Sequence, residues 1–430
     1  MMDPLLRLAS EVRTADVAPF VPALPWVAPF VVLLLAIAFL PLATPRFWES
    51  NLRKLGLALV LGLPVLVLYV RDNPHHLVLV AGEYVSFIVL LGSLFVISGG
   101  IFLEGDLPAT PRNNVLFLAL GAALASVVGT TGAAMLLIRP VLQSNRERRH
   151  VWHTVVFFIF LVANLGGCLT PLGDPPLFLG YLQGVPFTWT LRLAPEWAFA
   201  CGVLLVVYYL WDRRQYARET EEARLRDRLE VRPIRIGGRF NFALLLGVVA
   251  AVALLEAPLR ELAMVALAVV SLLWTPRDLR RANHFTFHPI LEVAALFVGI
   301  FVTMLPALDL LRARGAELGV QQPWQFFWAT GTLSSFLDNA PTYLTFLALA
   351  QGLGLPGDVV GVPHDILRAL SLGAVFMGAN TYIGNGPNFM VRAIAEERGV
   401  RMPTFLGYML VSGIVLLPLF LVVTFLFLIG

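Results

Sequence analysis

The chain has 430 residues, of which 58% are hydrophobic and 14% charged, and its mean hydropathy of +0.78 is far above that of a soluble domain. A formal net charge of +3 gives no support to nucleic-acid binding. The two cysteines, Cys168 and Cys201, lie in apolar stretches, which argues against a disulfide framework and a thiolate metal site. The composition therefore indicates an all-α polytopic membrane protein.

Stretches of about 20 apolar residues can cross a bilayer as helices. Ten such stretches follow one another along the chain: 24–42, 55–70, 84–103, 151–182, 194–211, 240–255, 261–274, 289–308, 366–391 and 405–429. The first 22 residues mix polar and apolar types, and the apolar run after them has no small-residue cleavage site. We therefore expect no removable signal peptide.

Two further apolar stretches, 114–138 and 324–349, carry polar or glycine-rich tetrapeptides near their middles. These are Gly129-Thr130-Thr131-Gly132 and Asp338-Asn339-Ala340-Pro341. Length alone allows either a re-entrant hairpin or a strained single crossing. The positive-inside rule favours hairpins, because they place most of the 31 basic residues on one, cytoplasmic, side of the membrane.

The hairpins give five crossings and one hairpin on each side of an arginine-rich segment. An odd number of crossings in each half makes the second half inverted relative to the first. We expect a first repeat over 1–211 (hairpin 114–138, broken helix 151–182), a cytoplasmic linker over 212–239, and a second inverted repeat over 240–430 (hairpin 324–349, broken helix 366–391). The linker has nine arginines against six acids and is most simply solvated, with a regulatory or lipid-binding role as the alternative. Both termini would lie outside the cytoplasm, in an inner (plasma) membrane protein.

The most informative pattern occurs twice, 211 residues apart. The copies are Thr170-Pro171-Leu172-Gly173-Asp174-Pro175-Pro176 and Thr381-Tyr382-Ile383-Gly384-Asn385-Gly386-Pro387. Each copy interrupts an apolar stretch with glycine, proline and polar side chains, and lipid offers no hydrogen-bond partner to the freed backbone. Paired interruptions in two halves predict a transporter's binding site.

In such a transporter the hairpin tips and helix breaks converge near the midplane of the membrane. The candidate groups are Thr130, Thr131, Thr170, Asp174, Asp338, Asn339, Thr381, Asn385 and Asn388. Two carboxylates among hydroxyls and amides form a site for a hard cation such as Na⁺. A desolvated carboxylate can also hold a proton, which a bound cation displaces, so competition between Na⁺ and H⁺ suffices for antiport. We expect no cofactor besides these transported ions.

Each carboxylate has a structural alternative. Asp174 and Asp338 could cap half-helices through backbone hydrogen bonds, although an ionisable group at membrane depth costs about 2.5–3.5 kcal/mol on insertion scales and so favours a functional role. Glu83 and Glu292 begin equivalent helices of the two halves, and they are either interfacial or a second proton site. Asn164 and Asn380 either satisfy backbone near the breaks or serve as ligands, whereas His153 and Glu196 lie at expected helix ends, where an interfacial place is favoured.

At these residues the chain resembles a known family. The segments are Asn164-Leu165-Gly166-Gly167-Cys168-Leu169-Thr170-Pro171-Leu172-Gly173-Asp174 and Ser335-Phe336-Leu337-Asp338-Asn339-Ala340-Pro341. They are similar to segments of D-type bacterial sodium/proton antiporters, in the ion transporter superfamily that also holds citrate, dicarboxylate and arsenite carriers. The resemblance covers the order of helices and hairpins from about Tyr84 to Val391. It implies an elevator-type or rocking transporter, often a homodimer, with Asp174 and Asp338 as ion-binding carboxylates and Thr170, Asn339, Thr381 and Asn385 around them.

Two functions stay open. Na⁺/H⁺ exchange is favoured by Asp174 and Asp338 and by the lack of any arginine at the predicted site. Uptake of a carboxylate such as citrate, coupled to Na⁺ or H⁺, is the alternative, because half-helix N-termini can hold an anion without a basic side chain. A cavity large enough for a six-carbon acid would favour uptake, although the chain lacks the Ser-Asn-Thr triplets that the dicarboxylate branch has at its tips and breaks. An enzyme or channel has little support, since the chain has no HExxH helix, nucleophile elbow or repeated carbonyl filter.

Overall fold

The computed structural model describes residues 20–229 and 231–429. Within them, seven helices are long and apolar enough to cross a membrane, or eight if the bent pair at 288–318 is counted as one span. This confirms an all-α polytopic membrane protein. The expectation about a signal peptide falls on residues that lie almost entirely outside the described ones.

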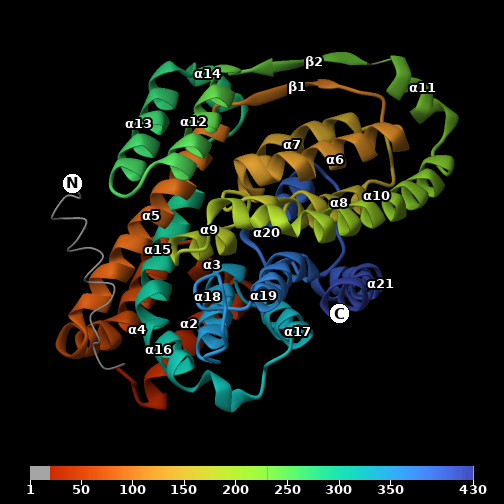
Figure 1. The fold of residues 1–430 in the computed structure, drawn as a ribbon. Helices are drawn as coiled ribbons and strands as arrows, with labels where there is room; N and C mark the ends of the chain where they lie inside the picture. Colours follow the sequence, from red (N-terminus) through yellow and green to blue (C-terminus); the bar gives the residue numbers. More distant parts are fainter. Residues whose placement is uncertain (1–19, 230, 430) are drawn as a thin grey trace.

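The chain is built almost wholly of helices, joined by short turns (Figure 1). The helices of the first half are α2 (Ala28–Ala43), α3 (Pro45–Trp48), α4 (Asn51–Asp72), α5 (Pro74–Ser98), α6 (Pro111–Val128), α7 (Thr130–Ser144), α8 (Trp152–Leu161), α9 (Pro175–Leu182), α10 (Ala194–Ala217) and α11 (Glu221–Leu229). Those of the second half are α12 (Phe240–Leu254), α13 (Leu259–Trp274), α14 (Arg277–Ala282), α15 (His288–Thr303), α16 (Leu305–Arg314), α17 (Pro323–Ser334), α18 (Asn339–Gln351), α19 (His364–Met377), α20 (Gly386–Glu397) and α21 (Phe405–Val423). Two strands, β1 (Phe102–Asp106) and β2 (Arg232–Gly237), pair antiparallel.

The helices form two groups that can be followed in Figure 1. Helices α4, α5, α12, α13 and α15 pack together on one side, while α6 to α10 pack with α17 to α21 on the other. Helix α8 lies deepest, since every residue from Val155 to Val162 is fully buried. Its sequence is apolar on all faces, which is the pattern of a helix surrounded by other helices. The second group carries the candidate site.

Helices α6 and α7 fold back on each other at Gly129. The side chains of Asn114, near the start of α6, and Asn145, just after α7, exchange two hydrogen bonds of 2.9 Å. Gly129 makes the reversal with a φ of +82°, a conformation that favours glycine. Helices α17 and α18 also fold back, because the rings of Phe326 and Phe346 meet with their centroids 6.4 Å apart. The two ends of each hairpin therefore lie near each other.

The two helix breaks have matching backbone geometry. A 3₁₀ turn at Leu165–Leu169 separates α8 from α9, and another at Gly378–Asn380 separates α19 from α20. A Cβ atom on Gly173 would overlap the carbonyl oxygen of Gly167, and one on Gly384 would overlap that of Gly378. The duplicated motif thus has glycine where two backbone segments touch.

Residues 212–239, the expected cytoplasmic linker, are folded and only partly solvated. Helix α10 continues to Ala217, α11 follows, and β2 pairs with β1, with Phe102 opposite Gly237. Three acids of this segment are buried against the first half of the chain: Asp212, Glu219 and Asp227. Asp227, for example, accepts a hydrogen bond of 2.8 Å from the backbone N–H of Ala109. The segment folds because its carboxylates satisfy donors of the first half.

Asp212 is the most buried of these acids. It accepts hydrogen bonds from Arg148 at 2.5 Å and from His153 Nε2 at 2.7 Å, and the exposed fractions of Asp212 and His153 are both 0%. His153 is therefore buried within the protein, and its expected interfacial depth stays a prediction. Its ring stacks on Trp211, with the two centroids 6.2 Å apart. This pairing fixes the end of α10 against the start of α8.

Glu219 lies beyond the membrane-length part of α10. Burial raises the pKa of its carboxyl group, but the backbone N–H groups of Arg149 and His150 donate to it at 3.0–3.1 Å and hold that pKa below its ordinary value. The carboxylate therefore joins the turn after α10 to the turn before α8.

Candidate ion-binding site

Asp174 is the centre of the candidate site. Its carboxylate is 1% exposed and accepts three hydrogen bonds. The hydroxyl of Thr130 donates to Oδ1 at 2.9 Å, and the amide of Asn385 donates to the same oxygen at 3.1 Å. The amide of Asn339 donates to Oδ2 at 2.6 Å. The three donors come from both hairpins and from the other helix break. Hydrogen bonds to an ionised carboxylate are stronger than those between neutral groups, so these contacts would hold the side chain firmly in place.

The four residues share one local position in the sequence. Asp174 and Asn385 immediately precede α9 and α20, whereas Thr130 and Asn339 are the first residues of α7 and α18. Four helix N-termini therefore meet at one carboxylate. Helix N-termini carry partial positive charge, which favours an anion there without any basic side chain.

Thr170 and Thr381 have another role. Their hydroxyls donate to the backbone carbonyls of Ser126 and Ser335, at 2.5 Å in both cases. Each bond joins a helix break to the hairpin of the same half. The two serines were not predicted from the sequence, although they lie four residues before Thr130 and Asn339, respectively. A comparison of the two halves position by position could have found them.

Asn388 likewise does not contact Asp174 but connects backbone and side-chain groups of the two helix breaks. Its amide nitrogen donates to the carbonyls of Gly378 at 2.8 Å and Thr381 at 2.9 Å, and its oxygen accepts from Asn164 at 2.7 Å. Asn164 lies just after α8, so this bond connects the two breaks. The structural role expected for Asn164 agrees with these contacts.

Buried oxygen atoms without a donor lie beside these contacts. The Oδ1 atoms of Asn339, Asn164 and Asn380 have no hydrogen-bond partner in the described part of the chain. A buried acceptor without a donor costs about 1–3 kcal/mol, so each such atom calls for an explanation. Amide and carboxylate oxygens are ligands of hard cations. Asn339 offers such an oxygen on the same side chain that holds Asp174.

Asp338 differs from Asp174 in exposure and in contacts. It is partly exposed, and its Oδ1 accepts a hydrogen bond of 3.0 Å from the backbone N–H of Ala340. This is the cap that we considered as its structural alternative. Its neighbour Asn339 reaches Asp174 instead. The described residues contain no group of three or more His, Cys, Asp or Glu side chains that could hold a metal ion, so a cation here would also need neutral oxygens as ligands.

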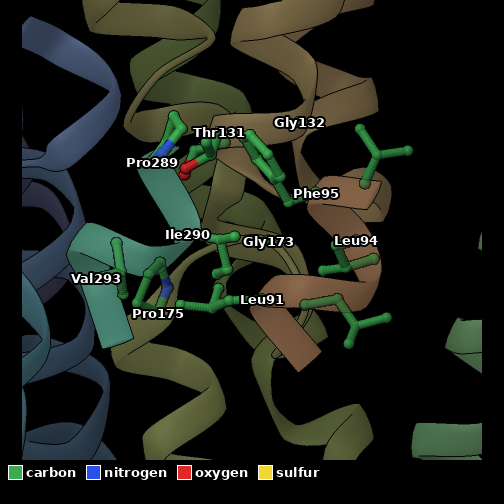
Figure 2. A pocket seen from close by; sticks show the side chains of 14 residues that line it. Leu91, Leu94, Phe95, Thr131, Gly132, Gly173, Pro175, Pro289, Ile290 and Val293 are labelled. Atoms are coloured by element: carbon green, nitrogen blue, oxygen red, sulfur yellow. The ribbon is translucent and has the colours of Figure 1, made fainter. Parts of the chain in front are cut away.

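A cavity of about 70 Å³ is lined by the two sequence neighbours of Asp174, Gly173 and Pro175, but not by Asp174 itself (Figure 2). Its walls come from α5, the start of α7, the first helix break and α15; they include Leu91, Leu94, Phe95, Thr130, Thr131, Gly173, Pro175, Pro289, Ile290 and Val293. Thr131, the remaining hairpin-tip candidate, thus lies on the cavity. One water occupies about 30 Å³ in the liquid, and organic ligands occupy pockets of about 300–1,000 Å³. In this conformation the cavity has room for an ion or a few waters.

Glu83 and Glu292 make hydrogen bonds to partners other than Asp174. Glu83 accepts a hydrogen bond of 2.8 Å from Gln183, at the end of α9. Glu292 accepts one of 2.6 Å from Lys54, which is 2% exposed. This pair was not predicted from the sequence. Lys54 is the single lysine among the 31 basic residues, but nothing near it in the sequence points to Glu292.

The chain is similar to a known protein family over almost its whole length. A model of the family described as "Putative citrate transport" matches residues 21–428. The chain belongs to this citrate transport family. The family match supports a secondary transporter. The resemblance to D-type sodium/proton antiporters stays a prediction, and the comparison with curated proteins gives no match.

Proposed function

We propose that this family member exchanges Na⁺ for H⁺ by alternating access, with Asp174 binding the two ions in turn. The observation that supports this most is a single buried carboxylate held by neutral donors only. In the described part of the chain no lysine or arginine pairs with it. A carboxylate without a fixed positive partner needs a mobile one, and either Na⁺ or H⁺ can fill that role.

The exchange would follow from competition at the Asp174 oxygens. Na⁺ would take oxygens of Asp174 and Asn339 as ligands, and the proton on the carboxylate would leave to the side from which Na⁺ came. The group of α6 to α10 and α17 to α21 would then move relative to α4, α5 and α15, so that the occupied site opens to the other side. Two inverted repeats, a cytoplasmic arginine-rich face and a homodimer belong to the same proposal.

Coupled uptake of citrate is the second candidate, because the family description names that substrate. The start of α7, with Thr131 on the cavity, would be the place for one carboxylate of the acid. The cavity of about 70 Å³ and its lack of basic side chains favour an inorganic ion over a six-carbon acid.

The test is purified protein in proteoliposomes, with the internal pH and the uptake of labelled citrate both recorded. We expect Na⁺ to drive proton movement in the wild type and in Asp278→Asn, a control at a fully exposed carboxylate. We expect no movement with Asp174→Asn. Citrate uptake without any Na⁺-driven proton movement would overturn the exchange reaction and establish the second candidate. Loss of exchange in Asp338→Asn, where asparagine can still cap α18, would show that Asp338 is a second ion ligand.

A further inference from the structure

An open groove of about 820 Å³ lies at the C-terminal end of α10, and α10 with the residue that follows it supplies the whole lining. It is lined by Val207, Leu210, Trp211, Arg213, Arg214, Gln215, Ala217 and Arg218. Its apolar residues lie toward the middle of α10, and its three arginines lie toward the end. The ion exchange proposed above does not use this surface.

The lining follows the helical period. Val207, Trp211 and Gln215 recur every four residues, and Leu210, Arg214 and Arg218 form a parallel row. The two rows make one continuous stripe. Leu210 is 53% exposed although it lies within a membrane-length apolar helix, whereas Arg214 and Arg218 are exposed where that apolar length ends. The stripe therefore passes from a lipid-facing surface to a water-facing one. A phospholipid has the same order, since its acyl chains are apolar and its phosphate is exposed to water.

The arginines of the groove carry uncompensated charge. None of Arg213, Arg214 and Arg218 forms an ion pair with a carboxylate of the described residues; Arg218 has only a 3.5 Å hydrogen bond to Gln215. The two nearest acids in sequence are committed elsewhere, Asp212 to Arg148 and Glu219 to the turn before α8. Guanidinium groups present planar donors that match phosphate oxygens. The surface thus suits an anion attached to an apolar body.

Trp211, in the apolar part of the groove, is packed against other aromatic rings on its inner side. The ring of Trp211 packs against Trp152 and Phe157, with centroid distances of 5.7 and 6.0 Å, in addition to its stacking on His153. A side chain held by three rings loses little freedom when a ligand contacts its outer face, which favours binding.

We propose that this groove is a binding site for a phospholipid with an anionic head group. The phosphate lies among Arg213, Arg214 and Arg218, and an acyl chain lies along Val207 and Leu210. Each basic residue near an anionic lipid surface strengthens binding about fivefold, so the three arginines together account for on the order of 100-fold.

Native mass spectrometry of the purified, delipidated protein tests this, with phosphatidylglycerol and phosphatidylcholine added separately. We expect wild type to retain phosphatidylglycerol preferentially. The variant R213Q/R214Q/R218Q is expected to lose this preference, with apparent affinity reduced on the order of 100-fold. The variant R232Q/R235Q/R239Q removes the same charge from exposed positions on or beside β2 and is expected to retain the lipid.

Thermal unfolding in detergent separates the remaining outcomes. Phosphatidylglycerol should raise the melting temperature of the wild type and of R232Q/R235Q/R239Q but not that of R213Q/R214Q/R218Q, and inorganic phosphate alone should raise none. Equal retention of phosphatidylglycerol by both triple variants would overturn the proposal, as would equal stabilisation by inorganic phosphate. Should R213Q/R214Q/R218Q fail to fold, the single variant Arg214→Gln is expected to weaken lipid binding about fivefold, and an unchanged affinity would contradict the site.

Discussion

Replacing Asp174 by asparagine keeps the size of the side chain and removes its charge. Three donors face the carboxylate, from Thr130, Asn339 and Asn385. An asparagine has one acceptor oxygen and one NH₂ group. With the oxygen in the place of Oδ1, it still accepts from Thr130 and Asn385, but its NH₂ group then opposes the amide nitrogen of Asn339, 2.6 Å from the atom it replaces.

The structure gives two opposing magnitudes for this substitution. Loss of the hydrogen bond from Asn339 to a charged acceptor costs about 1.5–3 kcal/mol. Removal of a charge at membrane depth recovers about 2.5–3.5 kcal/mol on insertion scales. The free energy of unfolding should therefore change by less than about 2 kcal/mol, in either direction, while Na⁺-driven proton exchange should fall at least 100-fold because the proton has no carrier.

Thermal unfolding in detergent and proton flux in proteoliposomes, measured on the same preparation of Asp174→Asn, separate the two effects. A folded variant with a melting temperature close to that of the wild type and no exchange agrees with the reasoning. A variant that retains a tenth or more of the wild-type exchange would refute it. A variant that unfolds would show that the carboxylate is needed for the fold.

Three further predictions concern other parts of the structure. Lys54→Met should lower the free energy of unfolding by about 2–3 kcal/mol, which is less than for a fully buried pair because Glu292 is 32% exposed. Adding Glu292→Leu should restore most of this loss, measured by chemical unfolding, and the absence of any recovery would contradict the pairing. Gly173→Ala should cost about 3 kcal/mol because the new Cβ overlaps a backbone carbonyl, whereas Gly202→Ala meets nothing and should leave the melting temperature unchanged or higher; equal effects would be incompatible with the close approach. Glu219→Gln should lower the melting temperature at pH 7, because a carboxyl group with a lowered pKa stabilises the fold at any pH above its ordinary pKa of about 4.5. The difference from wild type should shrink as the pH falls below about 4.5. A difference that is constant with pH would argue against the ionised form.

The sequence predicted which segments meet better than it predicted what each side chain does. The doubled motif and the two hairpin tips identified Asp174, Thr130, Asn339 and Asn385, and the structure brings them together. The repeat made this possible, because the same interruption in both halves indicates which positions correspond, even where the residue types at those positions differ. The inverted relation of the two halves stays a prediction.

The separate roles of the side chains within the site could not be predicted from the sequence. Asp174 and Asp338 both precede helices, and only the contacts show that the first is bound by three side chains whereas the second caps its own helix. Thr170 and Thr381 face backbone carbonyls because the hairpins pass beside the breaks, which is a matter of packing. The pairing of Lys54 with Glu292 joins residues 238 apart in the sequence, and no local pattern contains it.

The folded segment 212–239 was missed because its composition is that of a solvated linker. Its arginines are mostly exposed, as the composition indicates, but three of its acids turn inward to donors supplied by the first half. Strand β2 forms because β1 is present to pair with it. Both are tertiary effects that override local preference.

The proposed exchange requires Na⁺ and H⁺ to compete for the carboxylate of Asp174. The most direct test adds Na⁺ to purified protein in detergent, in weakly buffered solution with a pH indicator, at several pH values between about 5.5 and 8. We expect Na⁺, but not choline, to release protons from the wild type in a pH-dependent amount approaching one per chain, and Asp174→Asn to release none. Equal release from Asp174→Asn, or no release from the wild type at any pH while Na⁺ binds, would contradict the proposed exchange.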